Sequence, residues 1–130
     1  MKRTTGLAAA ALALWCGAAS AEDFKVGLVL PMTGPGADIA KNLALGFNAM
    51  VPLINDRGGI AGMKLAPVIC DSQSQEQQAI ICDRRLLADE KVDFLLGNGS
   101  TPQTLAALPT IEQTGTPLFS MAGAPRSTAR

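Results

Sequence analysis

The residues best suited to bind a ligand lie in one short segment, Gly-Asn-Gly-Ser-Thr-Pro, at positions 97–102. Its glycines allow the main chain to approach a ligand closely, and the hydroxyls of Ser100 and Thr101 can donate hydrogen bonds. Pro102 is typical of the first turn of a helix, and the free N–H groups at a helix N-terminus favour an anion such as a carboxylate. The same hydroxyls could instead serve only as helix caps. The segment therefore predicts either an anion-binding loop or a plain helix cap.

This segment does not match the glycine-rich motifs of enzymes. A dinucleotide-binding fingerprint needs glycine or alanine where Pro102 stands, and a nucleophile elbow around Ser100 needs glycine where Asn98 and Pro102 stand. The chain contains no histidine, which excludes histidine bases, histidine-containing triads and histidine metal ligands. No convincing nucleophile and base can be paired. An enzyme is therefore the least favoured class, and we expect no metal site and no cofactor.

Three cysteines, Cys16, Cys70 and Cys82, are too few for a four-cysteine zinc site. In an exported protein, Cys70 and Cys82 could form a disulfide. Against this bond, Cys82 is expected about two turns into the helix that follows Cys70, whereas a disulfide needs Cα atoms within about 7 Å. Cys82 also fits an apolar helix stripe, which it shares with Ala79 and Leu86, as a buried thiol. The disulfide and the two free thiols both remain open.

The first 21 residues have the pattern of a secretory signal peptide. Two basic residues follow the initiating Met, residues 7–19 are almost wholly apolar, and residues 19–21 form a small-residue cleavage site. The apolar stretch is shorter than the roughly 20 residues that a membrane-spanning helix needs. We therefore expect residues 1–21 to be removed on export, the mature protein to begin at Glu22, and no membrane insertion after cleavage.

The charges of the chain balance, with 11 Lys and Arg against 11 Asp and Glu. Proteins that bind nucleic acids through the phosphate backbone carry an excess of basic residues. We therefore expect no nucleic-acid partner.

Short apolar runs and helical patterns alternate along the rest of the chain. The apolar runs, which are typical of buried strands, lie at residues 24–30, 64–70, 92–96 and 116–121. A pattern with the period of an α-helix separates each run from the next. The order βαβαβαβ predicts an α/β fold, namely a three-layer, mostly parallel, doubly wound sheet with helices on both faces.

Local signals predict where the helices begin and which residues they bury. The expected N-caps are Asp38, Ser74 at the start of a capping box, and Thr101. Apolar residues spaced by three and four from Ile39 onward predict the buried face of the first helix. Pro67 predicts that the second strand lies at an edge of the sheet or starts late.

Sheets of this kind bind ligands at the carboxyl ends of their strands, near a switch in strand order. The loops expected at those ends are residues 33–36, 71–74, 97–102 and 122–125. The third loop carries the candidate anion-binding residues described above.

The run Phe-Lys-Val-Gly-Leu-Val-Leu-Pro-Met-Thr-Gly-Pro-Gly-Ala at 24–37 is similar to the opening of type I periplasmic solute-binding proteins. These proteins serve ABC importers of the branched-chain amino acid class. The similarity continues at residues 54–62, 71–74 and 115–118, and it covers nearly all of the chain after the leader. It implies two α/β lobes that close on a ligand, with residues 22–130 as the first part of the first lobe. The resemblance thus implies that the chain is an N-terminal fragment of such a protein.

The resemblance also implies which residues contact the ligand. In the family, the loop after the third strand binds a carboxylate, and the loops after the first and fourth strands add contacts. The matching positions are Thr33, Gly34, Gly99, Ser100, Thr101, Ala122, Gly123 and Ala124. Ala124 stands where the family commonly has a Thr that helps hold an α-ammonium, and the first loop lacks the usual aromatic residue. An amino acid, another small carboxylate and an amide therefore remain open as ligands.

These features favour the solute-binding component of an ABC importer, a periplasmic monomer that delivers a small polar solute to a membrane permease. An exported sensor domain of the same fold would look identical over these residues. An exported enzyme is the weaker alternative.

Overall fold

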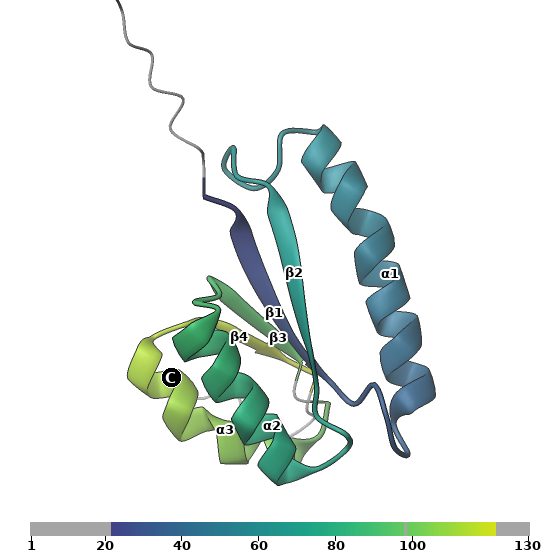
Figure 1. Ribbon diagram of the computed structural model, residues 1–130, viewed down its shortest axis with the longest axis vertical. Coiled ribbons are helices and arrows are strands. Elements are labelled where there is room, and N and C mark those ends of the chain that lie inside the picture. Colours follow the sequence, from purple (N-terminus) through teal and green to yellow (C-terminus); the bar gives the residue numbers. More distant parts are fainter. Residues whose placement is uncertain (1–21, 98, 122–130) are drawn as a thin grey trace, which may run out of the picture.

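A parallel sheet of four strands forms the middle layer of the computed structural model, which describes residues 22–97 and 99–121 (Figure 1). The strands are β1 (Phe24–Leu30), β2 (Leu65–Asp71), β3 (Phe94–Gly97) and β4 (Leu118–Ser120). They lie in the order β2-β1-β3-β4, and every pairing is parallel. The prediction from Pro67 is confirmed, because β2 lies at an edge and Pro67 pairs with Val26 of β1.

Helices cover both faces of the sheet. The long helix α1 (Ala37–Asp56) lies on one face, while α2 (Glu76–Arg84) and α3 (Thr101–Thr114) lie side by side on the other (Figure 1). A short π-helical segment, Arg85–Asp89, continues α2. The predicted three-layer, parallel α/β fold is confirmed.

Strand β1 separates two hydrophobic cores, because successive side chains of a strand point to opposite faces. Leu28 and Leu30 belong to the core beneath α1, and Val29 belongs to the core beneath α2 and α3. All three are almost completely buried. The predicted helix stripe is also confirmed, since its members are fully buried in the second core: Ala79, Cys82 and Leu86.

The expected N-caps of the first two helices were wrong. The N-cap of α1 is Gly36, and Asp38 lies in the first turn, where a negative charge complements the helix dipole. The N-cap of α2 is Gln75. Ser74 is turned away from α2, because its hydroxyl bonds to the loop between β1 and α1. Tertiary contacts therefore override the capping-box pattern.

Candidate functional site

The switch in strand order lies between the carboxyl ends of β1 and β3. The chain leaves β1 toward β2 on one side and later crosses to β3 on the other side. The loops that follow β1 and β3 diverge at this point, and ligands of open α/β sheets bind there. One residue of each predicted loop, Gly36 and Gly99, therefore lies at the position where the fold favours a ligand.

The N-terminus of α3 lies at this point. Its N-cap is Ser100 rather than the expected Thr101, and the Ser100 Oγ accepts a hydrogen bond from the Gln103 N–H at 3.4 Å. Capping uses a lone pair of the hydroxyl and leaves its hydrogen free to donate elsewhere. The two interpretations of this segment are therefore compatible, because Ser100 can cap the helix and donate to a ligand.

The start of α3 differs electrostatically from the starts of the other helices. The first turn of α1 contains Asp38 and that of α2 contains Glu76, whereas the first turn of α3 has no acidic residue. Thr101 is the first residue of α3, and its N–H has no acceptor among residues 22–97 and 99–121. The partial positive charge of this helix end is thus open to an external anion.

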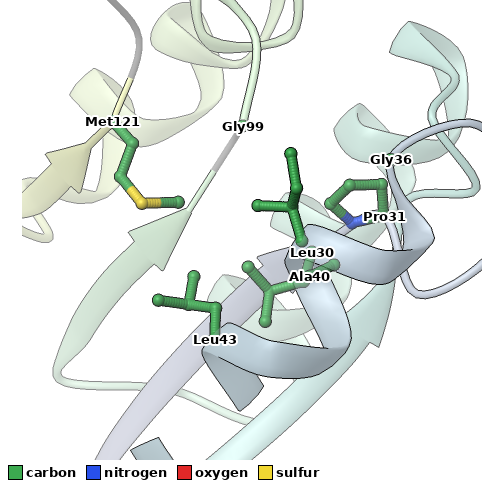
Figure 2. A pocket seen from close by; sticks show the side chains of 8 residues that line it. Leu30, Pro31, Gly36, Ala40, Leu43, Gly99 and Met121 are labelled. Carbon is green, nitrogen blue, oxygen red and sulfur yellow. The ribbon is translucent and has the colours of Figure 1, made fainter. Parts of the chain in front are cut away.

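An open cavity of about 130 Å³ lies beside this helix start, between α1, Pro31 and Gly36 after β1, Gly99 after β3 and Met121 at the end of β4 (Figure 2). In Figure 2, the Met121 side chain extends from the end of β4 toward the α1 side. The lining is almost entirely apolar and consists of Leu30, Pro31, Gly36, Ile39, Ala40, Leu43, Gly99 and Met121. Such a surface suits the apolar part of a small molecule.

The prediction that Ile39 belongs to the buried face of α1 was wrong. Ala40 and Ala44 are the buried residues of the helix, whereas Ile39 is 79% exposed and lines the cavity. Adjacent residues of a helix point about 100° apart, so burying Ala40 against the sheet leaves Ile39 facing the open edge. Periodicity alone could not separate these two directions, because both residues are apolar.

Of the predicted ligand-contacting residues that the structure describes, Gly99 lines the cavity. Ser100 and Thr101 follow it directly at the helix start, while Thr33 and Gly34 lie in the loop after β1. The Thr33 hydroxyl is already engaged, since it donates to Asp71 Oδ2 at 2.7 Å. The other predicted contacts, Ala122, Gly123 and Ala124, lie outside the described residues, as does the predicted signal peptide.

The two glycines of the loop after β3 have different roles. Gly97 has a φ of +133°, and a Cβ there would lie 2.2 Å from the Val29 carbonyl oxygen. Gly97 is therefore needed for close packing of β3 on β1 and not for approach to a ligand. A Cβ at Gly99 would lie 3.9 Å from its nearest neighbour, the Pro31 Cδ, so this position is open.

The carboxylate of Asp71 joins the ends of β1 and β2. It accepts hydrogen bonds from the Thr33 N–H at 3.2 Å, from the Thr33 hydroxyl and from the Gln73 N–H at 2.8 Å. Partial burial raises the pKa of Asp71, but the hydrogen bonds from Thr33 and Gln73 outweigh it, so the pKa lies below its ordinary value of 3.8. The carboxylate is thus ionised and firmly held.

Cys70 and Cys82 form a disulfide in the structure, with Cα atoms 5.6 Å apart. Both residues are buried, and the bond joins the end of β2 to α2. The chain reverses tightly between these two elements, and the Gln75 N–H donates to the Ser72 carbonyl at 2.8 Å. The reversal brings the helix stripe over the strand end, which the count along the sequence did not reveal.

Within residues 22–97 and 99–121, no three Cys, Asp or Glu side chains gather into a group that could hold a metal ion. In the same part of the chain, no helix is both long and apolar enough to cross a membrane.

The family model for periplasmic binding proteins matches residues 23–129. The chain belongs to this family. Leu/Ile/Val-binding protein homolog 1 of Brucella abortus is 36% identical over 109 residues, which are 82% of this chain and 29% of that protein. Homolog 7 of the same organism is 35% identical over 116 residues, 88% of this chain and 29% of that protein. The chain thus spans less than a third of the length of these relatives.

Solved structures agree with this assignment. A branched-chain amino acid transporter substrate binding protein from Streptococcus pneumoniae, in complex with isoleucine, has a TM-score of 0.76 and 27% identity, over 82% of this chain and 31% of that one. A solute binding protein of an ABC transporter from Rhodopseudomonas palustris, in complex with 3,4-dihydroxybenzoic acid, has a TM-score of 0.74 and 30% identity. The match covers 82% of this chain and 29% of that one. The predicted resemblance to type I periplasmic binding proteins of the Leu/Ile/Val-binding group is confirmed.

Proposed function

We propose that the full protein is the solute-binding component of an ABC importer, which captures a small carboxylate with an apolar body and delivers it to a membrane permease. In this proposal the leader is cleaved on export and the protein acts in the periplasm as a monomer. Residues 22–130 form the first part of one of two lobes that close on the solute. The names of the relatives support this role, because they are amino-acid-binding proteins or solute-binding proteins of transporters.

One observation carries the proposal for the ligand, namely an apolar cavity beside a helix N-terminus that has no acidic residue in its first turn. A carboxylate at Ser100 and Thr101 would face the positive end of α3. The rest of the molecule would then extend over Gly99 toward Ile39 and Met121. The ligands in the two solved structures, isoleucine and 3,4-dihydroxybenzoic acid, are both carboxylates, one with an alkyl side chain and the other with an aromatic ring.

The size of the cavity supports enclosure by a second lobe. Small-molecule sites usually have volumes of about 300–1,000 Å³ and bury most of the ligand surface. The open cavity of about 130 Å³ provides one wall of such a site. In the proposal, the remainder of the protein supplies the opposite wall.

A thermal-shift experiment on the mature full-length protein tests the proposal. The probes are isoleucine and 3,4-dihydroxybenzoate, each paired with the amide that replaces its carboxylate. We expect at least one acid to raise the melting temperature, since a ligand at 100 times its Kd stabilises the folded state by about 2.7 kcal/mol. The matched amide should have a much smaller effect. Equal shifts by acid and amide would refute the carboxylate preference, and no shift by either acid would count against this ligand class.

A further inference from the structure

The loop after β1 (residues 31–36, the first loop) is fastened to the last residue of β2 and the turn that leads to α2 (residues 71–75, together the second turn). Thr33 is bound through its N–H and its hydroxyl to the carboxylate of Asp71, at 3.2 and 2.7 Å. The hydroxyl of Ser74 accepts from the Gly36 N–H and donates to the Thr33 carbonyl, both at 3.3 Å. Four hydrogen bonds thus join two surface segments about 40 residues apart in sequence.

The two segments also fit closely. Gly34 has a φ of +85°, and a Cβ there would lie 3.1 Å from both the Gln73 carbonyl oxygen and the Ser74 hydroxyl. Gln73 and Ser74 have φ angles of +53° and +58°, in the left-handed region that side chains of this kind rarely adopt. Strained conformations persist where surrounding contacts hold them, and they gather at functional sites. The Gln73 N–H is held by Asp71 Oδ1 at 2.8 Å.

The second turn is anchored in the core on its other side. Cys70, immediately before Asp71, is joined to Cys82 of α2, and the N–H of the fully buried Ser72 donates to the Leu30 carbonyl at 2.9 Å. The turn is therefore a fixed support, and the first loop is the part that it positions.

We propose that Asp71 is a positioning residue for ligand binding, which holds the first loop in the conformation that forms one wall of the cavity. Pro31 and Gly36 of this loop line the cavity, whereas Asp71 and Ser74 do not. Asp71 acts through Thr33, whose hydroxyl serves to hold the loop instead of contacting the ligand. This inference rests on the proposed solute-binding function.

The test compares Asp71→Ala with Asp93→Ala in the mature full-length protein. Asp93 is a matched control, because its carboxylate also accepts a backbone N–H, from Lys25 at 2.8 Å, at the opposite end of β1. With isoleucine or 3,4-dihydroxybenzoate as the probe, Asp71→Ala should weaken binding about tenfold, which corresponds to a loop that is correctly placed a tenth of the time. Asp93→Ala should leave affinity unchanged. Asp71→Asn retains acceptors and offers a donor to the Thr33 hydroxyl, so it should restore most of the affinity.

Amide hydrogen exchange provides a readout that does not depend on the ligand. Asp71→Ala should speed exchange of the Thr33 and Gly36 amides about tenfold, and Asp93→Ala should not. If both alanine variants bind and exchange like the wild type, the inference is overturned. If the wild type binds neither acid, the proposed ligand class fails separately. Exchange alone then decides, and unchanged exchange at these amides in Asp71→Ala overturns the positioning role.

Discussion

Replacement of Ser100 by Ala should lower both the stability of the protein and its affinity for a carboxylate. Loss of a serine N-cap costs about 0.5–2 kcal/mol of stability. The capping bond to the Gln103 N–H is long, at 3.4 Å, so we expect the lower part of that range. The hydroxyl hydrogen remains available to the ligand, and a hydrogen bond to a charged group contributes about 1.5–3 kcal/mol. Its loss should raise Kd roughly 10- to 150-fold.

Thr101→Ala separates the two effects. Thr101 is the first residue of α3 and does not cap it, so its replacement should weaken binding while changing stability little. Thr114→Ala is the control at the other end of the same helix. The Thr114 hydroxyl donates to the Ile111 carbonyl at 2.9 Å, and its loss should affect stability and not affinity.

Calorimetric titration with the acid from the thermal-shift screen, together with urea unfolding, measures both quantities for the three variants. The reasoning is refuted if Ser100→Ala is destabilised but both Ser100→Ala and Thr101→Ala bind the acid as tightly as the wild type. Ser100 would then serve only as a helix cap, and the proposal of an anion site at the start of α3 would be wrong.

The remaining predictions concern the disulfide, the pH dependence and the leader. Cys82→Ala should lower the free energy of unfolding by about 3 kcal/mol, since the bond closes a short loop with a sequence separation of 12; two free thiols in denatured, unreduced mature protein would contradict the bond. The lowered pKa of Asp71 stabilises the folded state fully above pH 3.8, and this contribution is lost as the pH falls through the folded-state pKa. The wild type should therefore lose its advantage in unfolding free energy over Asp71→Asn as the pH falls below 3.8. A difference in unfolding free energy that does not change with pH would argue against the lowered pKa of Asp71. The intact mass of exported protein should correspond to a chain that begins at Glu22, whereas a mass that includes Trp15 would disprove this cleavage site.

The strands, their parallel pairing and the edge position of β2 could be predicted from the sequence, because they depend on strong local signals. The apolar run at 24–30 matches β1, and Pro67 correctly indicated an edge strand. The apolar stripe of Ala79, Cys82 and Leu86 likewise identified the buried face of α2. Each of these features follows from the side chains of one segment, without knowledge of its neighbours.

The details of the site depend on contacts between distant segments, so the sequence did not reveal them. Ser74 fits a capping box, yet its hydroxyl bonds to Thr33 and Gly36 of another loop. Ile39 fits the buried face of α1, yet it lines the cavity. Asp71 lies in the segment 71–74 that resembles the family, but nothing in that segment indicates its bonds to Thr33. These bonds depend on the pairing of β1 with β2, which places Leu30 beside Asp71.

A crystal structure of the mature full-length protein with the best-binding acid would test the central claim most directly. We predict that the carboxylate lies within hydrogen-bonding distance, about 2.7–3.2 Å, of the Thr101 N–H or of the Ser100 and Thr101 hydroxyls. We also predict that the apolar part of the ligand contacts Ile39 and Met121. A ligand bound away from the start of α3, or with its carboxylate turned from these residues, would contradict the proposed site.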